Sequence, residues 1–336
     1  MANKKIFYII ISLAFVINVY GQVGIKKVAQ STMNFQLVST SPKASGMGEA
    51  FTAVGTGVES IFYNPSALVE MDKTFSVSFS YTQWIADIKY LTGAAAWNLG
   101  NLGTVGLSLL TVDYGTIYAT RLPANTADLK GYIDDGVLGN VGAYSFGLSY
   151  AKAINDKFSI GGNVRYVGQN LGTNIFSSTN TIDNNASKLA FDAGVKYYTG
   201  IESFRFGMAI RNFSTDIKRQ EVAEVMPLTF TIGAAFDVMD IIMPDHNKDN
   251  SLTVAVDYLH SNSYNERVNL GVEYKMLGMV ALRGGYQTNR DIASWSAGAG
   301  FTTSVDGYDA EVNYSYSYIT EIAFKSVNRL SILFSF

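Results

Sequence analysis

Hydrophobic and polar residues alternate with a period of two along most of the chain. Between residues 74 and 82, for example, one face carries Phe75, Val77, Phe79 and Tyr81, and the other carries only Ser and Thr. Successive side chains of a β-strand point to opposite faces, so this alternation predicts strands with one apolar and one polar face. We expect about fourteen such strands of about ten residues each, the length that a tilted strand needs to cross a bilayer. The predicted spans are 73–83, 88–99, 102–113, 141–152, 157–168, 187–198, 202–212, 227–237, 251–260, 267–276, 279–288, 293–303, 308–318 and 328–336.

The connections between these spans predict neighbouring antiparallel strands. Short turns are expected at Asn155-Asp156, Gly200, Leu277-Gly278 and Asp306-Gly307. The longer links, at the opposite ends of the strands, are 114–140, 169–186, 213–226 and 319–327. Short turns on one side and long loops on the other are typical of bacterial outer-membrane barrels. The link 238–250 departs from this rule, because it is long but falls among the short turns.

The composition favours a membrane barrel over a soluble β-sandwich. Charged residues make up 16% of the 336 residues and hydrophobic residues 48%, whereas a soluble domain has about 25% charged residues. The charges lie on the polar faces of the predicted strands. The apolar faces repeat Phe and Tyr, as expected of a lipid-facing surface with aromatic girdles. The predicted fold is therefore all-β, a transmembrane antiparallel β-barrel with an N-terminal hatch or plug segment.

The inward faces of this barrel are predicted to carry a polar network. Buried charges normally pair, which favours a self-neutralising network that holds a plug over the alternative, a selective pore or ligand site. Many other inward positions are small, such as Gly147, Gly207, Gly233 and Gly271, and leave room for water or a folded segment. The candidate network residues are Arg165, Asp192, Arg205, Arg211, Asp237, Asp257, Glu273, Arg283 and Glu311, with Lys188, Lys196, Lys275 and Arg329 on the same faces.

The first residues are typical of a secretory signal peptide. Lys4 and Lys5 precede an apolar run that extends from residue 6 to residue 17, and Gly21 suits cleavage before Gln22. A membrane-anchor helix is the alternative, but a run of about 12 residues is shorter than the roughly 20 that span a bilayer. The chain is thus predicted to divide into a signal peptide (1–21), an N-terminal hatch segment (22–72) and the transmembrane β-barrel (73–336).

Two stretches of the segment 22–72 form a motif. In Ala44-Ser45-Gly46-Met47-Gly48-Glu49-Ala50, the glycines permit tight turns and a close approach to the barrel wall. In Tyr63-Asn64-Pro65-Ser66-Ala67-Leu68, Asn64-Pro65 is a turn signal. Together they resemble the hallmark of the PorV/PorQ family, relatives of the FadL-type fatty-acid transporters, with Ser66-Ala67 in place of the family's Ala-Gly. The resemblance covers the whole chain, up to a last strand that ends on Phe336.

This resemblance implies a FadL-like barrel in the outer membrane of a Gram-negative bacterium of the Bacteroidetes type, and it implies one of two functions. In the first, the protein is a non-enzymatic component of the type IX secretion system, which binds the translocon or receives secreted cargo through the cargo's C-terminal domains. In the second, it is a FadL-like transporter of hydrophobic small molecules. The inward faces read from the sequence are polar and small rather than apolar, which favours the first function.

No set of residues indicates an enzyme or a cofactor. The chain has no Cys, two His (His246 and His260) and no Gly-x-Ser-x-Gly motif. Asp245, Asn247 and Asp249 have the spacing of a calcium loop, but the Gly and Glu of that loop are missing, which favours a solvated turn. No long basic run indicates a nucleic-acid partner. The expected partners are outer-membrane lipid and other proteins, or a hydrophobic ligand, and loop 114–140 is a candidate lid or partner surface.

Overall fold

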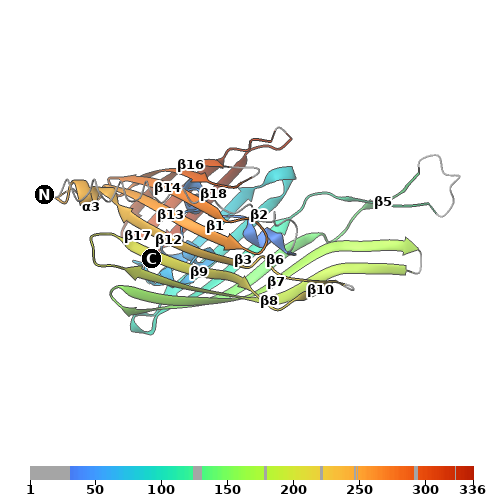
Figure 1. Cartoon of the computed structure of the whole chain (residues 1–336), viewed down its shortest axis with the longest axis horizontal. Coiled ribbons are helices and arrows are strands. Elements are labelled where there is room, and N and C mark those ends of the chain that lie inside the picture. The colour runs from blue at the N-terminus through green and yellow to red at the C-terminus, as the bar shows by residue number, and fades with distance from the viewer. Residues whose placement is uncertain are drawn as a thin grey trace.

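Fourteen antiparallel strands close into one barrel (Figure 1). The computed structural model describes residues 31–123, 131–177, 180–219, 222–245, 247, 249–290, 294–321 and 323–336. Each barrel strand pairs with the next one along the chain, and β1 closes the barrel against β18. The strands are β1 (Phe75–Gln83), β2 (Lys89–Asn98), β3 (Thr104–Asp113), β6 (Gly142–Asn155), β7 (Phe158–Ser177), β8 (Asn180–Tyr198), β9 (Arg205–Phe213), β12 (Thr229–Asp237), β13 (Ser251–Ser261), β14 (Arg267–Met276), β15 (Val280–Gln287), β16 (Trp295–Val305), β17 (Tyr308–Ser317) and β18 (Val327–Ser335).

The predicted fold class is confirmed, and each predicted span corresponds to one barrel strand. The predicted link 169–186 is wrong, because β7 and β8 continue through it and remain paired up to Ser177 and Asn180. This part of the hairpin is rich in Asn, Thr and Ser. Beyond the apolar belt of the barrel neither face of a strand has to be apolar, so the alternation that marks a strand in the sequence disappears.

Two other predicted links contain small hairpins of their own. The link 114–140 contains β4 (Tyr118–Arg121) and β5 (Ile133–Val137), which pair with each other. The link 213–226 contains β10 (Ile217–Arg219) and β11 (Val222–Glu224), which also pair with each other. The longer connections, apart from the one between β12 and β13, lie at one end of the barrel, on the right of Figure 1, which we call the long-loop end.

The opposite end, on the left of Figure 1, is the short-turn end. It carries the connections β2–β3, β6–β7, β8–β9, β12–β13, β14–β15 and β16–β17, together with the C-terminus. The connection β12–β13 is the long one noted in the sequence. It contains a short helix, α3 (Val238–Ile242), whose N-terminus is capped by the carboxylate of Asp237.

The outer surface of the barrel is apolar. Phe79, Leu107 and Leu148, near the middle of their strands, are 60%, 58% and 65% exposed. The residues next to them along these strands point inward and are buried serines or glycines, such as Ser108 and Ser149. Soluble proteins rarely expose so large an apolar belt, which matches the hydrocarbon of a bilayer. None of the described helices is long and apolar enough to cross a bilayer.

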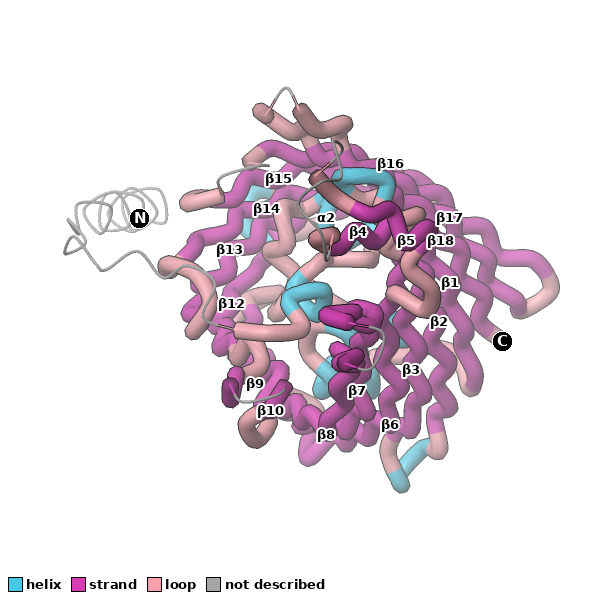
Figure 2. The backbone as a smooth tube through the Cα atoms, turned by 90° about the vertical axis from the view of Figure 1, so that its right-hand side faces the viewer, coloured by secondary structure: helices cyan, strands magenta, loops and turns pink. Residues whose placement is uncertain are grey.

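Residues 31–74, which precede β1, run through the lumen from one end to the other (Figure 2), and we call them the inner segment. At the long-loop end, the N–H of Thr32 donates to the carbonyl of Val225 (3.0 Å). At the short-turn end, the segment leads into β1, where Phe75 is hydrogen-bonded to Phe336. Its elements are all short: η2 (Asn34–Leu37), α2 (Pro42–Gly46), η3 (Val58–Phe62) and η4 (Pro65–Val69).

Small wall residues make room for this segment. A Cβ atom at Gly161 or Gly194 would overlap Asn64-Pro65, and one at Gly207 would overlap Thr52. The inner segment therefore occupies the space that the small inward residues leave free.

An arginine on the outer face is expected to destabilise the barrel. Leu148→Arg would place a charge near the middle of β6, where the lipid contact costs about 2–4 kcal/mol. The measurement is the denaturant concentration at which the barrel unfolds in vesicles, compared with that of Leu148→Ala as an uncharged truncation. Equal midpoints for the two variants would mean that this face does not lie in hydrocarbon.

Candidate functional site

Charged side chains of the wall hold the backbone of the inner segment. Asp257 on β13 accepts hydrogen bonds from the N–H groups of Phe51 (3.0 Å) and Thr52 (2.9 Å). Irregular backbone at membrane depth needs such partners, because no secondary structure satisfies its polar groups. Four cationic wall residues donate to backbone carbonyls of the segment: Arg205 to Ala53 (3.1 Å), Arg211 to Phe62 (2.7 Å), Lys196 to Gly55 (3.0 Å) and Arg329 to Ser39 (2.8 Å).

All four charged side chains between residues 31 and 71 form ion pairs. The pairs with the wall are Lys43–Glu311 (2.6 Å), Glu49–Arg290 (2.8 Å) and Glu70–Lys196 (2.7 Å). The remaining charge, Glu59, lies 3.6 Å from Lys43 within the segment and is 3% exposed. Because a buried charge without its partner is costly, these pairs fix the position of the segment along the barrel axis.

The first half of the predicted motif packs against β15 and β16. A Cβ on Gly46 would lie 3.2 Å from the Cα of Gly298 on β16, and Met47 is fully buried. Gly48 has a positive φ of 61°, and a Cβ there would lie 2.6 Å from the backbone nitrogen of Tyr286. The two glycines thus serve a left-handed turn and a close approach of two backbones.

The second half of the motif links two parts of the inner segment to β8. Asn64 caps η4 by accepting a hydrogen bond from the N–H of Ser66 (3.2 Å), and Pro65 follows at the first helical position. The side-chain amide of Asn64 donates to the carbonyls of Thr52 (2.9 Å) and Val195 (3.1 Å). Asn64 therefore begins η4 and fixes it to the wall at Val195.

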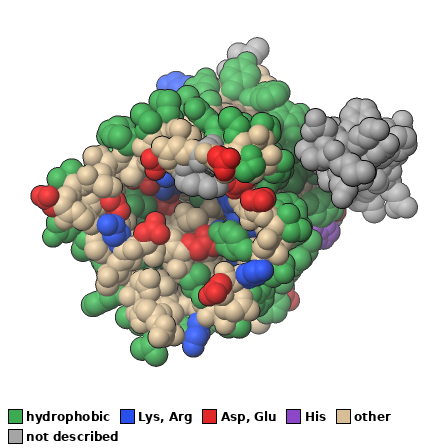
Figure 3. All heavy atoms as spheres, turned by 90° about the vertical axis from the view of Figure 1, so that its left-hand side faces the viewer, with side chains coloured by type: hydrophobic (Ala, Val, Ile, Leu, Met, Phe, Trp, Pro, Cys, Tyr) green, Lys and Arg blue, Asp and Glu red, His purple; other side chains and the backbone are tan. Residues whose placement is uncertain are grey.

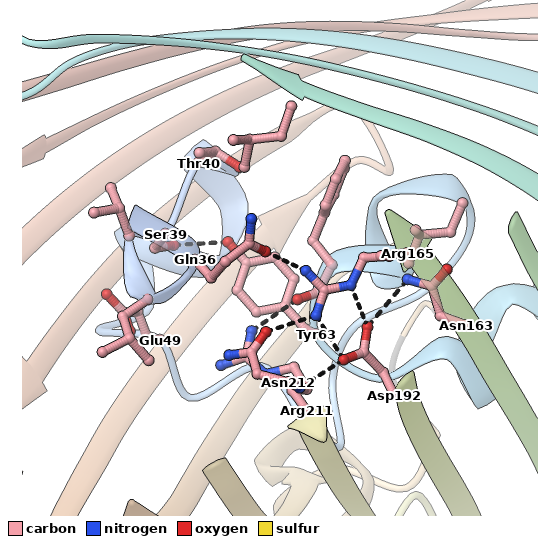
Figure 4. Close-up of a pocket in the computed structure, with 15 residues that line it drawn as sticks. Gln36, Ser39, Thr40, Glu49, Tyr63, Asn163, Arg165, Asp192, Arg211 and Asn212 are labelled. Carbon is pink, nitrogen blue, oxygen red and sulfur yellow. Dashed lines mark hydrogen bonds and ion pairs between the residues drawn. The ribbon is translucent and has the colours of Figure 1, made fainter. Parts of the chain in front are cut away.

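A small cavity lies near the middle of the lumen, between the inner segment and strands β7, β8 and β9 (Figure 4). Its wall side is organised by Arg165, which makes two bonds of 2.7 Å to the carboxylate of Asp192 and one of 2.6 Å to Asn212. Arg165 also donates to the side-chain oxygen of Gln36 on the inner segment. The cavity measures about 40 Å³, enough for a few waters at about 10–15 Å³ each.

The barrel wall is irregular beside this cavity. The ladder between β8 and β9 shifts its register between Phe191 and Ala193, and Asn212 opposite has a positive φ of 63°. The N–H of Asn212 donates to Asp192 (2.8 Å) instead of continuing the ladder. Above this point, β8 stays paired with β7 but no longer with β9.

Tyr63 forms the opposite side of the cavity. Its hydroxyl is bonded to the hydroxyl of Ser39 (2.7 Å) and accepts from the N–H of Ser41 (3.2 Å). Its ring meets Phe51 edge-on at 5.2 Å, and the guanidinium of Arg211 lies 5.7 Å from the ring centre. The ring and hydroxyl of Tyr63 therefore connect the stretch around Ser39 with the stretch around Phe51 at this level of the lumen.

Above the cavity, toward the long-loop end, the lumen is apolar. Met33 and Phe35 of the inner segment pack there against inward-facing wall residues. The expectation of inward faces that are polar and small is therefore wrong for this half of the lumen. Burial raises the pKa of the Tyr114 hydroxyl at its edge, so that group stays neutral. The apolar cluster consists of Met33, Phe35, Tyr90, Leu110, Val112, Ala143, Val167, Ala190, Ile217 and Met226.

At the short-turn end the lumen is charged instead. A second cavity of about 260 Å³ is lined by Lys43, Glu273, Arg283 and Glu311, among others. Glu273 and Arg283 form an ion pair of 2.5 Å. Figure 3 shows this end of the barrel, where acidic and basic side chains surround a central hollow. The two ends of the lumen therefore differ in polarity.

The structure separates the nine predicted network residues into several groups. Arg165 and Asp192 pair at the central cavity, whereas Glu273, Arg283 and Glu311 line the charged one. Arg205, Arg211 and Asp257 bond to the backbone of the inner segment. Asp237 lies apart and caps α3, and Lys275 is exposed. Tyr63 lines the central cavity as the first residue of the second motif stretch. The cavity positions that the sequence does not reveal include Gln36, Ser39, Asn163 and Asn212, which are uncharged and carry no distinctive pattern.

The fold and the lumen define a class of closed membrane barrel in which a segment before the first strand fills the interior. Solved structures of this fold include the Ralstonia pickettii toluene transporter TbuX, with a TM-score of 0.57 and 13% identity over 89% of this chain and 98% of that one. The Pseudomonas putida toluene transporter TodX has a TM-score of 0.57 and 11% identity, over 87% and 96%. A Pseudomonas aeruginosa FadL homologue has a TM-score of 0.50 and 14% identity, over 93% and 98%. No protein-family model and no curated sequence matches the chain.

A side chain at Gly48 is expected to loosen the inner segment. Gly48→Ala would force a methyl group against β15 and destabilise docking by about 1–3 kcal/mol. Gly57→Ala is the matched control, since Gly57 also has a positive φ (64°) but no atom within 4 Å of its Cβ position. The measurement is the rate at which a protease cuts the inner segment of the detergent-solubilised barrel. Equal rates for the two variants would show that the contact with β15 contributes nothing.

Proposed function

We propose that this protein is an outer-membrane channel for small hydrophobic molecules, in which the inner segment acts as a hatch. The observation that carries this proposal is the apolar cluster at the long-loop end of the lumen, which opens onto the central cavity. Leu110 belongs to the cluster and also lines the cavity. The named structural neighbours are transporters of toluene and a FadL homologue. They support the transporter function and lend no support to a role in type IX secretion.

Entry begins where Met33 and Phe35 now fill the apolar cluster. These two side chains occupy the space that a hydrophobic ligand would take, so the ligand enters by displacing them. The central cavity beyond, at about 40 Å³, is too small for an aromatic ring. Passage through the described lumen therefore requires movement of the inner segment.

The two ends of the inner segment are held with unequal strength. The part nearest the long-loop end is held by apolar packing and by neutral hydrogen bonds, such as those of Thr32 to Val225 (3.0 Å) and Ser31 to Ser263 (2.5 Å). The part after residue 42 carries the three ion pairs to the wall. We therefore expect residues 31–35 to move, while the part from Gln36 onward, which Arg165 and Arg329 also hold, stays docked.

The exit lies in the wall rather than along the axis. The charged cavity at the short-turn end is unfavourable for a hydrophobic molecule. The register shift between β8 and β9 lies beside the central cavity and leaves the upper part of β8 without β9 as a partner. A ligand that reaches Asp192 is thus next to an interruption in the hydrogen-bond ladder of the wall. The predicted signal peptide (1–21) lies outside the described residues and remains a prediction.

Disulfide tethers test the movement of the hatch, and the absence of native Cys makes them specific. Ser31→Cys with Ser263→Cys would tie the outer end of the segment to the loop after β13, because the two hydroxyls lie 2.5 Å apart. Ser45→Cys with Ser315→Cys would tie α2 to β17, again across 2.5 Å. Ser76→Cys with Ser335→Cys, across 2.7 Å, joins two wall strands and serves as the control.

The expected result is a selective loss of uptake with the outer tether. Uptake of the apolar dye phenylnaphthylamine by cells should fall about tenfold when the Ser31–Ser263 tether is oxidised. A tether that raises the free energy of hatch opening by about 1.4 kcal/mol lowers the population of the open state tenfold. It should recover with reductant and stay unchanged with the other two tethers. Uptake that is insensitive to the outer tether would exclude a moving hatch. Uptake no faster than in cells without the barrel would exclude the channel.

A further inference from the structure

The connections at the short-turn end carry exposed aliphatic side chains. Within the described residues, four of the six connections there carry at least one, and at the other two, β6–β7 and β16–β17, one lies within the last two residues of the preceding strand. Their exposed fractions lie between 42% and 70%. We call this set the aliphatic rim: Leu99, Leu102, Ile154, Ile201, Ile241, Ile242, Leu277 and Val305. Such residues at the tips of turns are unfavourable in water.

The rim continues the lipid-facing surface of the strands. Val305 follows the exposed Phe301 at even spacing within β16, so both point outward. The exposed Leu99 and Ile154 lie two and four residues after the exposed Trp97 and Tyr150. A separation of two to four residues is about 7–13 Å along a strand, and less along the membrane normal because the strands are tilted. That depth matches the boundary of headgroups and acyl chains just beyond the aromatic girdle.

Hydrogen bonds fix the rim in place. The hydroxyl of Tyr150 donates to the carbonyl of Leu102 (2.6 Å), which joins the β2–β3 connection to β6. The N–H of Asp237 donates to Ser203 (2.7 Å), and the N–H of Gly278 donates to Asp249 (2.7 Å). The connections β8–β9, β12–β13 and β14–β15 are thereby linked side by side, so their aliphatic tips form a fixed surface.

The distribution of charge around this end favours lipid as the occupant. Charged residues such as Lys43, Arg283 and Glu311 line the cavity at the centre, whereas hydrophobic side chains gather along the upper and right-hand outline of the same face in Figure 3. A protein partner normally covers one face of a molecule, but the rim follows the whole circumference. Lipid surrounds a barrel on all sides.

We propose that the aliphatic rim is seated in the phospholipid leaflet on the short-turn side and sets the depth of the barrel in the membrane. This proposal rests on the membrane location within the proposed function. It also accounts for the long connection 238–250, whose helix α3 carries the exposed Ile241 and Ile242. The connection is long because it supplies a part of the rim.

Single cysteines along β6 and its turn test the proposal. Leu148→Cys lies in the middle of the outer face, Ile154→Cys lies on the rim, and Asp156→Cys lies two residues further on at an exposed turn position. Each is labelled with bimane and placed in phosphatidylcholine vesicles that contain a lipid with a spin label in the shallow part of its acyl chain. Ile201→Cys provides a second rim position on another connection.

The expected result is quenching of the Ile154 and Ile201 labels at least about twofold stronger than that of the Asp156 label, as for side chains at the headgroup boundary. Equal weak quenching at positions 154 and 156, with strong quenching at 148, would overturn the rim and leave the membrane barrel intact. Protection of position 154 from a water-soluble quencher in native membranes but not in vesicles would also overturn it, in favour of a protein partner. Failure of lipid to quench the Leu148 label would instead overturn the membrane location itself.

Discussion

The structure depends on the need to satisfy the backbone of an irregular chain inside a membrane barrel. The inner segment has only short helical turns, so its own secondary structure leaves most of its N–H and C=O groups without a hydrogen-bond partner. The wall supplies these partners through Asp257, Lys196 and the cationic residues around them. The polar inner face of the barrel, its glycines and the ion pairs of the segment all follow from this requirement. The outer face of the barrel does not contact the inner segment, so it supplies no such partners and is apolar.

The same requirement divides the lumen into a fixed half and a movable half. Where the wall is polar, each bond to the segment is made inside a low dielectric, and its loss would leave a buried charge unpaired. Where the wall is apolar, around Phe35, the contacts are non-directional, and another apolar group can replace them at little cost. A hydrophobic ligand competes with Phe35 on equal terms, but it cannot compete with the ion pair of Lys43 and Glu311. In the channel that we propose, gating therefore belongs to the long-loop half.

The sequence predicts the barrel well because one face of each strand must be apolar over the membrane. The alternation ends where the membrane ends, and for this reason the sequence predicts a link where β7 and β8 continue. The side-chain partners in the lumen are less predictable. Lys43 meets Glu311 across 268 positions of the chain, and only the order and stagger of fourteen strands bring them to the same level. Leu110 and Val112 look like ordinary strand residues until Met33 and Phe35 lie against them. Asn212 donates its N–H to Asp192 from a left-handed backbone conformation, which the neighbouring residues do not predict.

The two ends of the barrel are opposite in polarity. At the long-loop end the inside is apolar, around Phe35, whereas at the short-turn end the inside is charged and the outside carries the aliphatic rim. For a hydrophobic molecule, the favourable surface is thus the inner face of the wall at the long-loop end and the outer face of the wall at the short-turn end. The free energy of transfer is lowest for a path that crosses the wall between these regions. The register shift at Asp192 lies on such a path, beside the one central cavity that the described residues leave next to β8 and β9. In the channel that we propose, the polarity of the barrel therefore favours a sideways route without any requirement for a pore along its axis.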